Sequence, residues 1–216
     1  MSYFNLPPQA RKKSIVPKHA FDASTNSKQK QLLVDVVERI TWEYELAPDT
    51  INLSGEKVKR LQVFKIVLKR KNDFEKVITI IEKASPYHII YEVVYIDEVL
   101  LYTSQKHPHP LNENNAVIDW VFKTDWFVDK KEEYQLDLKV SLDKVFEDFC
   151  FKISNNSNLA SEEDLKSLIE KEQKIQELKT QITKLEAQIK RTKQFNKKLP
   201  LNSQLNLLNS QLNHLV

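Results

Sequence analysis

A chain of 216 residues with a single glycine, Gly55, is restricted in the kinds of site it can build. Loops that bind phosphate groups need several glycines, because their backbone N–H groups must approach the anion closely. The nucleophile elbow of serine hydrolases likewise needs glycines on both sides of its serine. The sequence therefore excludes a Walker loop, a dinucleotide-binding fingerprint and a nucleophile elbow, and it predicts no bound cofactor.

Composition places the chain among globular proteins, because 41% of its residues are apolar and 29% are charged. The 33 basic and 30 acidic residues leave a net charge of +3, which is too weak to indicate nucleic-acid binding by itself. The one cysteine, Cys150, lies in an apolar stretch, where a buried core residue is favoured over a catalytic thiol. A lone thiol, and an N-terminus without the apolar core of a signal peptide, predict a cytoplasmic protein.

Hydrophobic periodicity predicts an α+β domain over residues 27–153, preceded by an extended, proline-containing arm at 1–26. Apolar residues spaced three and four apart predict helices at 28–45, 73–84 and 141–153. Alternating apolar residues predict strands at 61–70, 87–95, 99–104 and 116–123, with a polar loop at 107–115. We expect a small mixed β-sheet of about four strands, with a parallel strand–helix–strand crossover at its start and helices mostly on one face.

The most specific pattern follows a polar linker at 154–160 and fills residues 161–216. Apolar residues there repeat with the alternating four-and-three spacing of a coiled coil. The pattern is interrupted before Pro200, which removes a hydrogen bond from any helix that contains it. The residues on the predicted seam are Leu168, Ile175, Leu178, Ile182, Leu185, Ile189, Leu201, Leu205, Leu208, Leu212 and Leu215.

Two arrangements of this coiled-coil helical arm fit the sequence. The second helix can fold back on the first as an internal hairpin, or the arm can pair with another chain. The second helix is expected to be about half as long as the first, so that half of the first seam would stay uncovered. An apolar stripe that faces water is unfavourable. We therefore favour contact with a partner protein or a second copy.

Basic residues gather at both ends of the first predicted strand and at the tip of the arm. Each could contact a phosphate group of DNA, although strand ends are solvated and cations also suit a helix C-terminus. The candidate nucleic-acid contacts are Lys57, Lys59, Arg60, Lys69, Arg70, Lys71, Arg191, Lys193, Lys197 and Lys198.

Catalytic and metal sites are not indicated by any spacing. His107 and His109 flank a proline in the polar loop, but no further clustered cysteine or histidine completes a zinc site. A magnesium-dependent nuclease would need acidic residues beside a lysine, for which Glu92, Asp97 and Asp119 are the candidates. No Asp-x-Glu-x-Lys pattern, which would place two acids and a lysine on one face of a strand, occurs in the predicted strands. The sequence therefore predicts no catalytic residues and no metal ligands.

Five stretches together resemble an uncharacterised bacterial family, domain of unknown function 4391. They are DTINL at 49–53, VFKIVLK at 63–69, PYHII at 86–90, DKVFEDF at 143–149 and QFNKKLPLNSQL at 194–205. The likeness runs nearly from end to end and supports the layout of the fold more than a mechanism. It implies a companion of a helicase and a DNA methyltransferase in a restriction–modification or phage-defence system, and it implies no catalytic residues.

The hypothesis that unites these observations is a non-catalytic accessory or adaptor subunit of a bacterial DNA-defence complex. Its coiled coil would bind a helicase or methyltransferase partner or a second copy, and its basic edges would contact DNA. The alternatives are a magnesium-dependent nuclease and a stand-alone DNA-binding module. No small-molecule substrate and no membrane partner are indicated.

Overall fold

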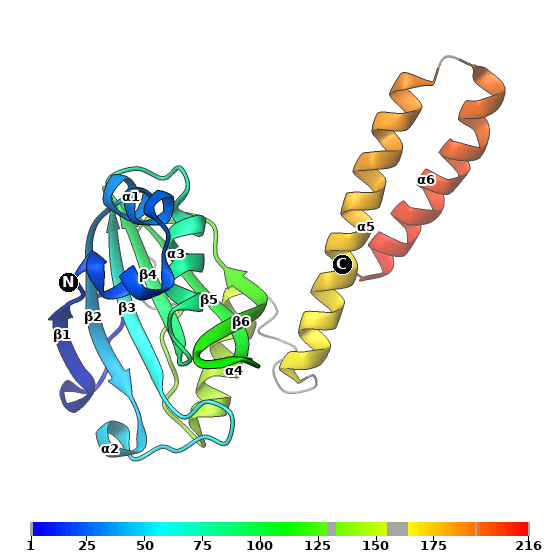
Figure 1. Ribbon diagram of the computed structural model, residues 1–216. Helices are drawn as coiled ribbons and strands as arrows, with labels where there is room; N and C mark the ends of the chain where they lie inside the picture. The colour runs from blue at the N-terminus through cyan, green and yellow to red at the C-terminus, as the bar shows by residue number, and fades with distance from the viewer. Residues whose placement is uncertain (1, 129–132, 155–163, 193, 216) are drawn as a thin grey trace. The chain divides into compact units, whose positions relative to one another are not determined.

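The computed structural model describes residues 2–128, 133–154, 164–192 and 194–215, without the side chains of residues 113, 114 and 195. The chain divides into two compact units, Met1–Ser161 and Glu162–Val216, which we call the body and the arm (Figure 1). The predicted linker at 154–160 lies, apart from its first residue, outside the described residues.

The body is built on one sheet of six strands, accompanied by α-helices and short 3-10 helices. The strands are β1 (Arg11–Ile15), β2 (Val37–Leu46), β3 (Leu61–Leu68), β4 (His88–Tyr95), β5 (Glu98–His109) and β6 (Asn112–Lys123). The helices of the body are η1 (Pro8–Ala10), η2 (Lys18–Ser24), α1 (Ser27–Val36), α2 (Pro48–Ile51), α3 (Phe74–Lys83) and α4 (Leu142–Ile153). The arm contains α5 (Leu165–Arg191) and α6 (Phe195–Leu215).

The strands lie side by side in the order of the chain, from β1 to β6. Every neighbouring pair is antiparallel except β3 and β4, which are parallel. Helix α3 connects these two strands, because parallel neighbours cannot be joined by a tight turn. The predicted mixed α+β sheet with a strand–helix–strand crossover is therefore confirmed, but the sheet has six strands and not about four.

One of the two additional strands comes from the predicted helix at 28–45. Helix α1 ends at Val36, and β2 begins at Val37 and pairs with β3 along its whole length. The run from Arg39 to Tyr44 contains isoleucine, threonine, tryptophan and tyrosine, which favour strands. The predicted helix was wrong there because Val36, Ile40 and Tyr44 also fit a four-residue spacing. The other additional strand, β1, lies in the predicted extended arm.

The predicted polar loop at 107–115 was also wrong, because β5 continues to His109 and β6 starts at Asn112. The register between β5 and β6 is irregular at two places, near Asp119 and near His109. Strand β1 is irregular as well, with Lys13 at a positive φ of 48°. Irregularities of this kind on edge strands hinder pairing with another sheet.

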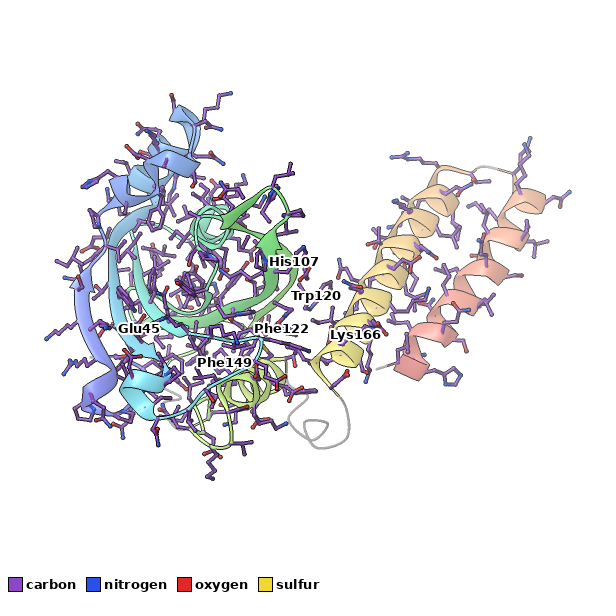
Figure 2. All side chains as sticks on the ribbon, turned by 60° about the horizontal axis from the view of Figure 1, so that its bottom comes forward. Glu45, His107, Trp120, Phe122, Phe149 and Lys166 are labelled. Carbon is purple, nitrogen blue, oxygen red and sulfur yellow. The ribbon has the colours of Figure 1, made fainter. Side chains whose placement is uncertain are left out.

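The sheet is covered on both faces. A core cluster joins η2, α1 and α3 to one face through residues such as Leu33, Ile78 and Ile89. Helix α4 covers the other face. His88 is next to Ile89 on β4 and therefore points to the opposite face, where its ring lies 4.5 Å from that of Phe146 in α4. Phe149 of α4 and Phe122 of β6 are both buried inside the body (Figure 2). The expectation of helices mostly on one face thus misses α4.

The turn that follows Gly55 is held to the start of α4 by hydrogen bonds, and its close packing leaves no room for a Cβ atom at Gly55. The carboxylate of Asp143 accepts hydrogen bonds from the backbone N–H groups of Glu56, Lys57 and Val58, at 2.6, 3.0 and 2.7 Å. A Cβ atom at Gly55 would lie 2.4 Å from the carbonyl oxygen of Val58. The single glycine therefore allows a close approach of the backbone to itself and serves the fold.

Candidate functional site

The arm forms a helical hairpin in which α5 and α6 pack against each other (Figure 1). Its predicted seam residues on α5 are Leu168, Ile175, Leu178 and Leu185, which are between 0 and 8% exposed, and the half-buried Ile182 and Ile189. Asp164 caps α5 by accepting a hydrogen bond from the N–H of Ser167 at 2.7 Å. The internal hairpin is thus the arrangement that this chain forms by itself.

Helix α6 is longer than the sequence predicts, because it begins at Phe195 and contains Pro200. Only about one helical turn precedes this proline, so the hydrogen bond that it removes lies close to the helix end. With 21 residues, α6 is six residues shorter than α5, which corresponds to about 9 Å of helix. The expectation of a second helix half as long as the first was therefore wrong.

The leucines of α6 are less well covered than their partners on α5. All five predicted seam residues are half-buried, namely Leu201, Leu205, Leu208, Leu212 and Leu215. Leu199 and Leu207 lie off the seam and are 53% and 59% exposed. The exposed apolar surface of the hairpin is therefore concentrated on α6.

Charge is divided unequally between the two helices. The exposed surface of α5 carries lysines, an arginine and glutamates, including an ion pair between Lys174 and Glu177 at 3.1 Å. From Leu201 to Leu215, by contrast, α6 contains no Asp, Glu, Lys or Arg. Desolvating charged groups is unfavourable, so α6 is the surface of the hairpin that is easier to bury.

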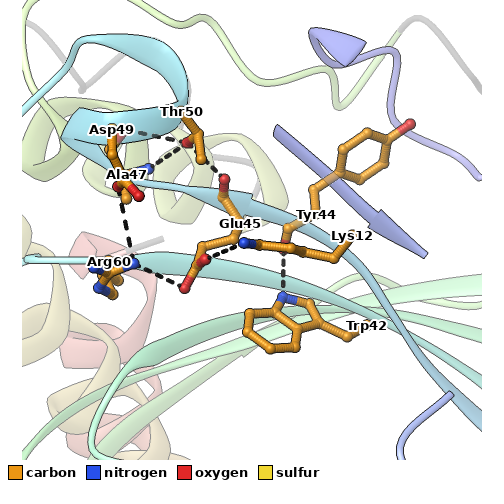
Figure 3. A network of polar contacts seen from close by, with 8 residues as sticks. All are labelled: Lys12, Trp42, Tyr44, Glu45, Ala47, Asp49, Thr50 and Arg60. Atoms are coloured by element: carbon orange, nitrogen blue, oxygen red, sulfur yellow. Dashed lines mark hydrogen bonds and ion pairs between the residues drawn. The ribbon is translucent and has the colours of Figure 1, made fainter. Parts of the chain in front are cut away.

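The basic residues before β3 are partly engaged in the body. Arg60 contacts Glu45 at 3.1 Å and Asp49 at 3.9 Å, and Lys12 contacts the other oxygen of Glu45 at 2.9 Å (Figure 3). Its hydrogen bond with Glu45 raises the pKa of Arg60 above its ordinary value. Lys57 and Lys59 are exposed, and Lys59 donates to the carbonyl oxygen of Gly55 at 3.3 Å. The predicted phosphate contact at Arg60 would therefore compete with two carboxylates.

The basic residues at the end of β3 are also partly engaged in contacts within the body. Lys69 donates to the carbonyl oxygen of Val34 at 2.8 Å, and Arg70 is exposed. Lys71 contacts Glu98 at 2.5 Å and lies 4.4 Å from the centre of the Trp126 ring. At the arm tip, Arg191 and Lys197 are exposed and Lys198 is half-buried, and Lys193 lies outside the described residues.

Only two of the three acidic candidates for a nuclease lie together. Glu92 and Asp97 line a pocket of about 400 Å³ together with Lys65, whereas Asp119 contacts His107 at 2.9 Å on the β5–β6 hairpin. Both oxygens of the buried Glu92 already have partners. Lys65 contacts one oxygen at 2.5 Å, and the N–H of Tyr3 donates to the other at 2.9 Å. Within the described ranges, no group of three His, Cys, Asp or Glu side chains is placed to bind a metal ion.

A second buried pair, which sequence reasoning missed, joins α3 to β5. The side chains of Glu82 and Lys106 are both 0% exposed, and their Oε2 and Nζ atoms are 2.5 Å apart. Lys106 also donates to the carbonyl oxygens of Glu82 and Ser85, at 3.2 and 3.0 Å. Burial raises the pKa of Glu82 and lowers that of Lys106, and each group opposes the shift of the other. The only signal was the position of Glu82, four residues after Ile78 on the apolar face of α3.

The thiol of Cys150 is fully buried in α4, and burial raises its pKa well above the ordinary value. A thiol that stays protonated and inaccessible is a poor nucleophile. This placement agrees with the core position predicted for Cys150. No helix in the described part of the chain is both long and apolar enough to cross a membrane.

The sequence profile of the family described as "Domain of unknown function (DUF4391)" matches residues 4–212. The chain belongs to this family. The DUF4391 match includes the body and nearly all of the arm, which confirms the resemblance seen in the sequence. No curated protein and no solved structure matches the chain. In this DUF4391 member, the arm surface, the exposed cations and the pocket beside Glu92 are the features that bear on the predicted functions.

Proposed function

We propose that this protein is a non-catalytic accessory subunit of a bacterial DNA-defence complex, and that its arm binds another protein of that complex. The observation that carries the proposal is the hairpin of α5 and α6, a separate compact unit whose second helix keeps half-exposed leucines and contains no Asp, Glu, Lys or Arg from Leu201 to Leu215. Fully desolvated centres of protein interfaces are depleted of charged residues and are built around apolar side chains.

An accessory role is also supported by the acidic groups of the body, because Glu92 and Asp119 already have partners within the protein. A magnesium ion would have to displace Lys65 and the Tyr3 N–H from Glu92 before it could bind there. Asp119 is engaged with His107 on a different part of the sheet. A nuclease therefore has less support than a protein that works through its surfaces.

The class of partner comes from the family setting that the sequence resemblance implies. A helicase or a DNA methyltransferase is accordingly the proposed partner. The exposed cations Lys57, Lys59 and Arg70 on the body, and Arg191 and Lys197 on the arm, are the groups that could contact DNA beside such an enzyme. Each phosphate contact would make DNA binding weaken steeply with salt.

Co-expression with the proteins encoded next to this chain tests the proposal. A tagged full-length chain should capture a helicase or methyltransferase, and deletion of residues 164–216 should abolish the capture. The matched control is the full chain with Lys57→Glu, Lys59→Glu and Arg70→Glu, which changes the body and leaves the arm intact. Far-UV circular dichroism should show a folded body in both variants. Unchanged capture by the arm deletion would overturn the proposal.

A further inference from the structure

Helix α6 presents an exposed stripe that no contact within the hairpin explains. Gln204, Leu207 and Gln211 are all exposed, and their spacing of three and four residues places them on one side of the helix. Leu207 is 59% exposed although it is a large apolar residue. The stripe lies beside the half-buried Leu201 and Leu208, which are three or four residues from Gln204. Together these residues form a continuous surface, which we call the α6 stripe.

We infer that the α6 stripe binds the α6 stripe of a second copy of this chain, with the two helices antiparallel. The inference rests on the proposed role of the arm as a docking element and names one occupant for one of its surfaces. In a two-fold dimer the same patch meets itself, so the patch must be complementary to itself. A patch that carries charge of one sign would repel its copy, but the α6 stripe contains no charged residue.

The polar residues of α6 strengthen this argument. Two carboxamide side chains, those of Gln204 and Gln211, lie on the α6 stripe and are exposed. A carboxamide both donates and accepts hydrogen bonds, so these two can pair with the same two glutamines of a second copy. The exposed lysines and glutamates of α5 would remain in water in such a dimer. An acidic or basic partner would find no opposite charge on the α6 stripe.

The spacing of the stripe also suits an antiparallel pair. Gln204 and Gln211 lie three and four residues on either side of Leu207, so a two-fold axis near Leu207 sets Gln204 of one copy beside Gln211 of the other. The two hairpins would then form a four-helix bundle, in which the half-buried leucines of α6 turn toward a shared core. Parallel packing about a two-fold axis would instead set each glutamine beside its own counterpart.

Light scattering of the purified full-length chain over a range of concentrations tests the inference. The expected mass approaches twice the 25.4 kDa of one chain. Two double variants then test the orientation of the helices. Gln204→Glu/Gln211→Glu places like charges opposite each other and should weaken the dimer by roughly tenfold or more. Gln204→Glu/Gln211→Lys places opposite charges together and should keep the dimer at least as tight.

The control is Thr180→Glu/Thr183→Glu, which adds the same charge at exposed positions of α5 and should leave the dimer unchanged. Circular dichroism should show the same helix content in all variants. A monomer mass at every concentration, or equal weakening by both glutamine variants, would overturn the inference. A monomer that still captures an enzyme partner through the arm refutes only the second copy. A dimer that captures no partner refutes only the proposed function.

Discussion

The buried pair of Glu82 and Lys106 allows a quantitative prediction. Lys106→Met keeps an unbranched side chain of similar length but removes the ammonium group from beside Glu82. The two side chains are fully buried, so the carboxylate of Glu82 would lose its charged partner without gaining contact with bulk solvent. Removing one member of a buried ion pair costs about 3–5 kcal/mol. The carbonyl oxygens of Glu82 and Ser85 also lose a donor. We therefore expect a loss of about 4 kcal/mol, a large part of the stability of a typical domain.

Urea unfolding at pH 7, followed by tryptophan fluorescence and far-UV circular dichroism, measures this loss. The loss should depend on pH in a defined direction. Burial raises the pKa of Glu82 above its ordinary value of 4.5 in the folded state. Without Lys106 the only way to avoid a buried charge is to keep the proton. The penalty should therefore be small near pH 4.5 and should grow as the pH rises through the pKa of the folded variant.

The double variant Glu82→Met/Lys106→Met separates the pair from its surroundings. Replacing both members of a buried pair by apolar residues is often neutral or stabilising, so most of the lost stability should return. A loss below about 1 kcal/mol for Lys106→Met at pH 7 would refute the reasoning. So would a penalty that grows as the pH falls, because it would show that Glu82 is not the group left without a partner.

Three further predictions concern the backbone of the body. Ile96 has a positive φ of 55° and is 73% exposed, so Ile96→Asn should raise the free energy of unfolding by about 1 kcal/mol, seen as a higher thermal midpoint. Gly55→Ala should lower that midpoint, because its Cβ atom would meet the Val58 carbonyl oxygen at 2.4 Å; an unchanged midpoint would contradict the close approach. Burial would raise the pKa of Asp143, but its three backbone hydrogen bonds lower it overall. Asp143→Asn should therefore cost about 1–3 kcal/mol at pH 7 in urea unfolding, and the difference from the unmodified chain should shrink as the pH falls through that lowered pKa.

The centre of the sheet could be predicted from the sequence, because β3 and β4 are buried and strongly patterned. Both are rich in β-branched and aromatic residues, and the amphipathic helix between them permits only a crossover. Helix α4 was also predictable, with Ser141 accepting a hydrogen bond from the N–H of Lys144 as an N-cap. In these segments the local preference of the residues and the tertiary contacts point to the same structure.

The edges of the sheet could not be predicted in the same way. Strand β1 is exposed along its whole length, so no apolar alternation marks it. Strand β2 satisfies both a helical and an extended spacing, and only its pairing with β3 decides between them. Strand β5 extends through His107, Pro108 and His109, and β6 begins at Asn112, although these residues resemble those of a loop. These strands depend on neighbours that are distant in the sequence.

The helices of the candidate site could be predicted from the sequence, but the burial of their leucines could not. The heptad spacing identifies both helices of the arm, because that pattern is local to each helix. The spacing does not reveal how far each leucine is covered, which depends on the partner helix, and so the half-burial of α6 was not foreseen. The pair of Glu82 and Lys106 was missed because its members are 24 residues apart and belong to different elements.

The contrast between the charged surface of the body and the uncharged stretch of α6 gives the strongest reason to look for function on the arm. The body uses many of its cations internally, since Arg60, Lys65, Lys71 and Lys106 each contact a carboxylate. Both edge strands of its sheet are irregular, which hinders the addition of a further strand. Helix α6, in contrast, exposes Leu207 and carboxamides that have no need of charged partners. Burying such a surface does not require charged groups to be removed from water. Another protein can therefore bind there at a low free-energy cost of desolvation.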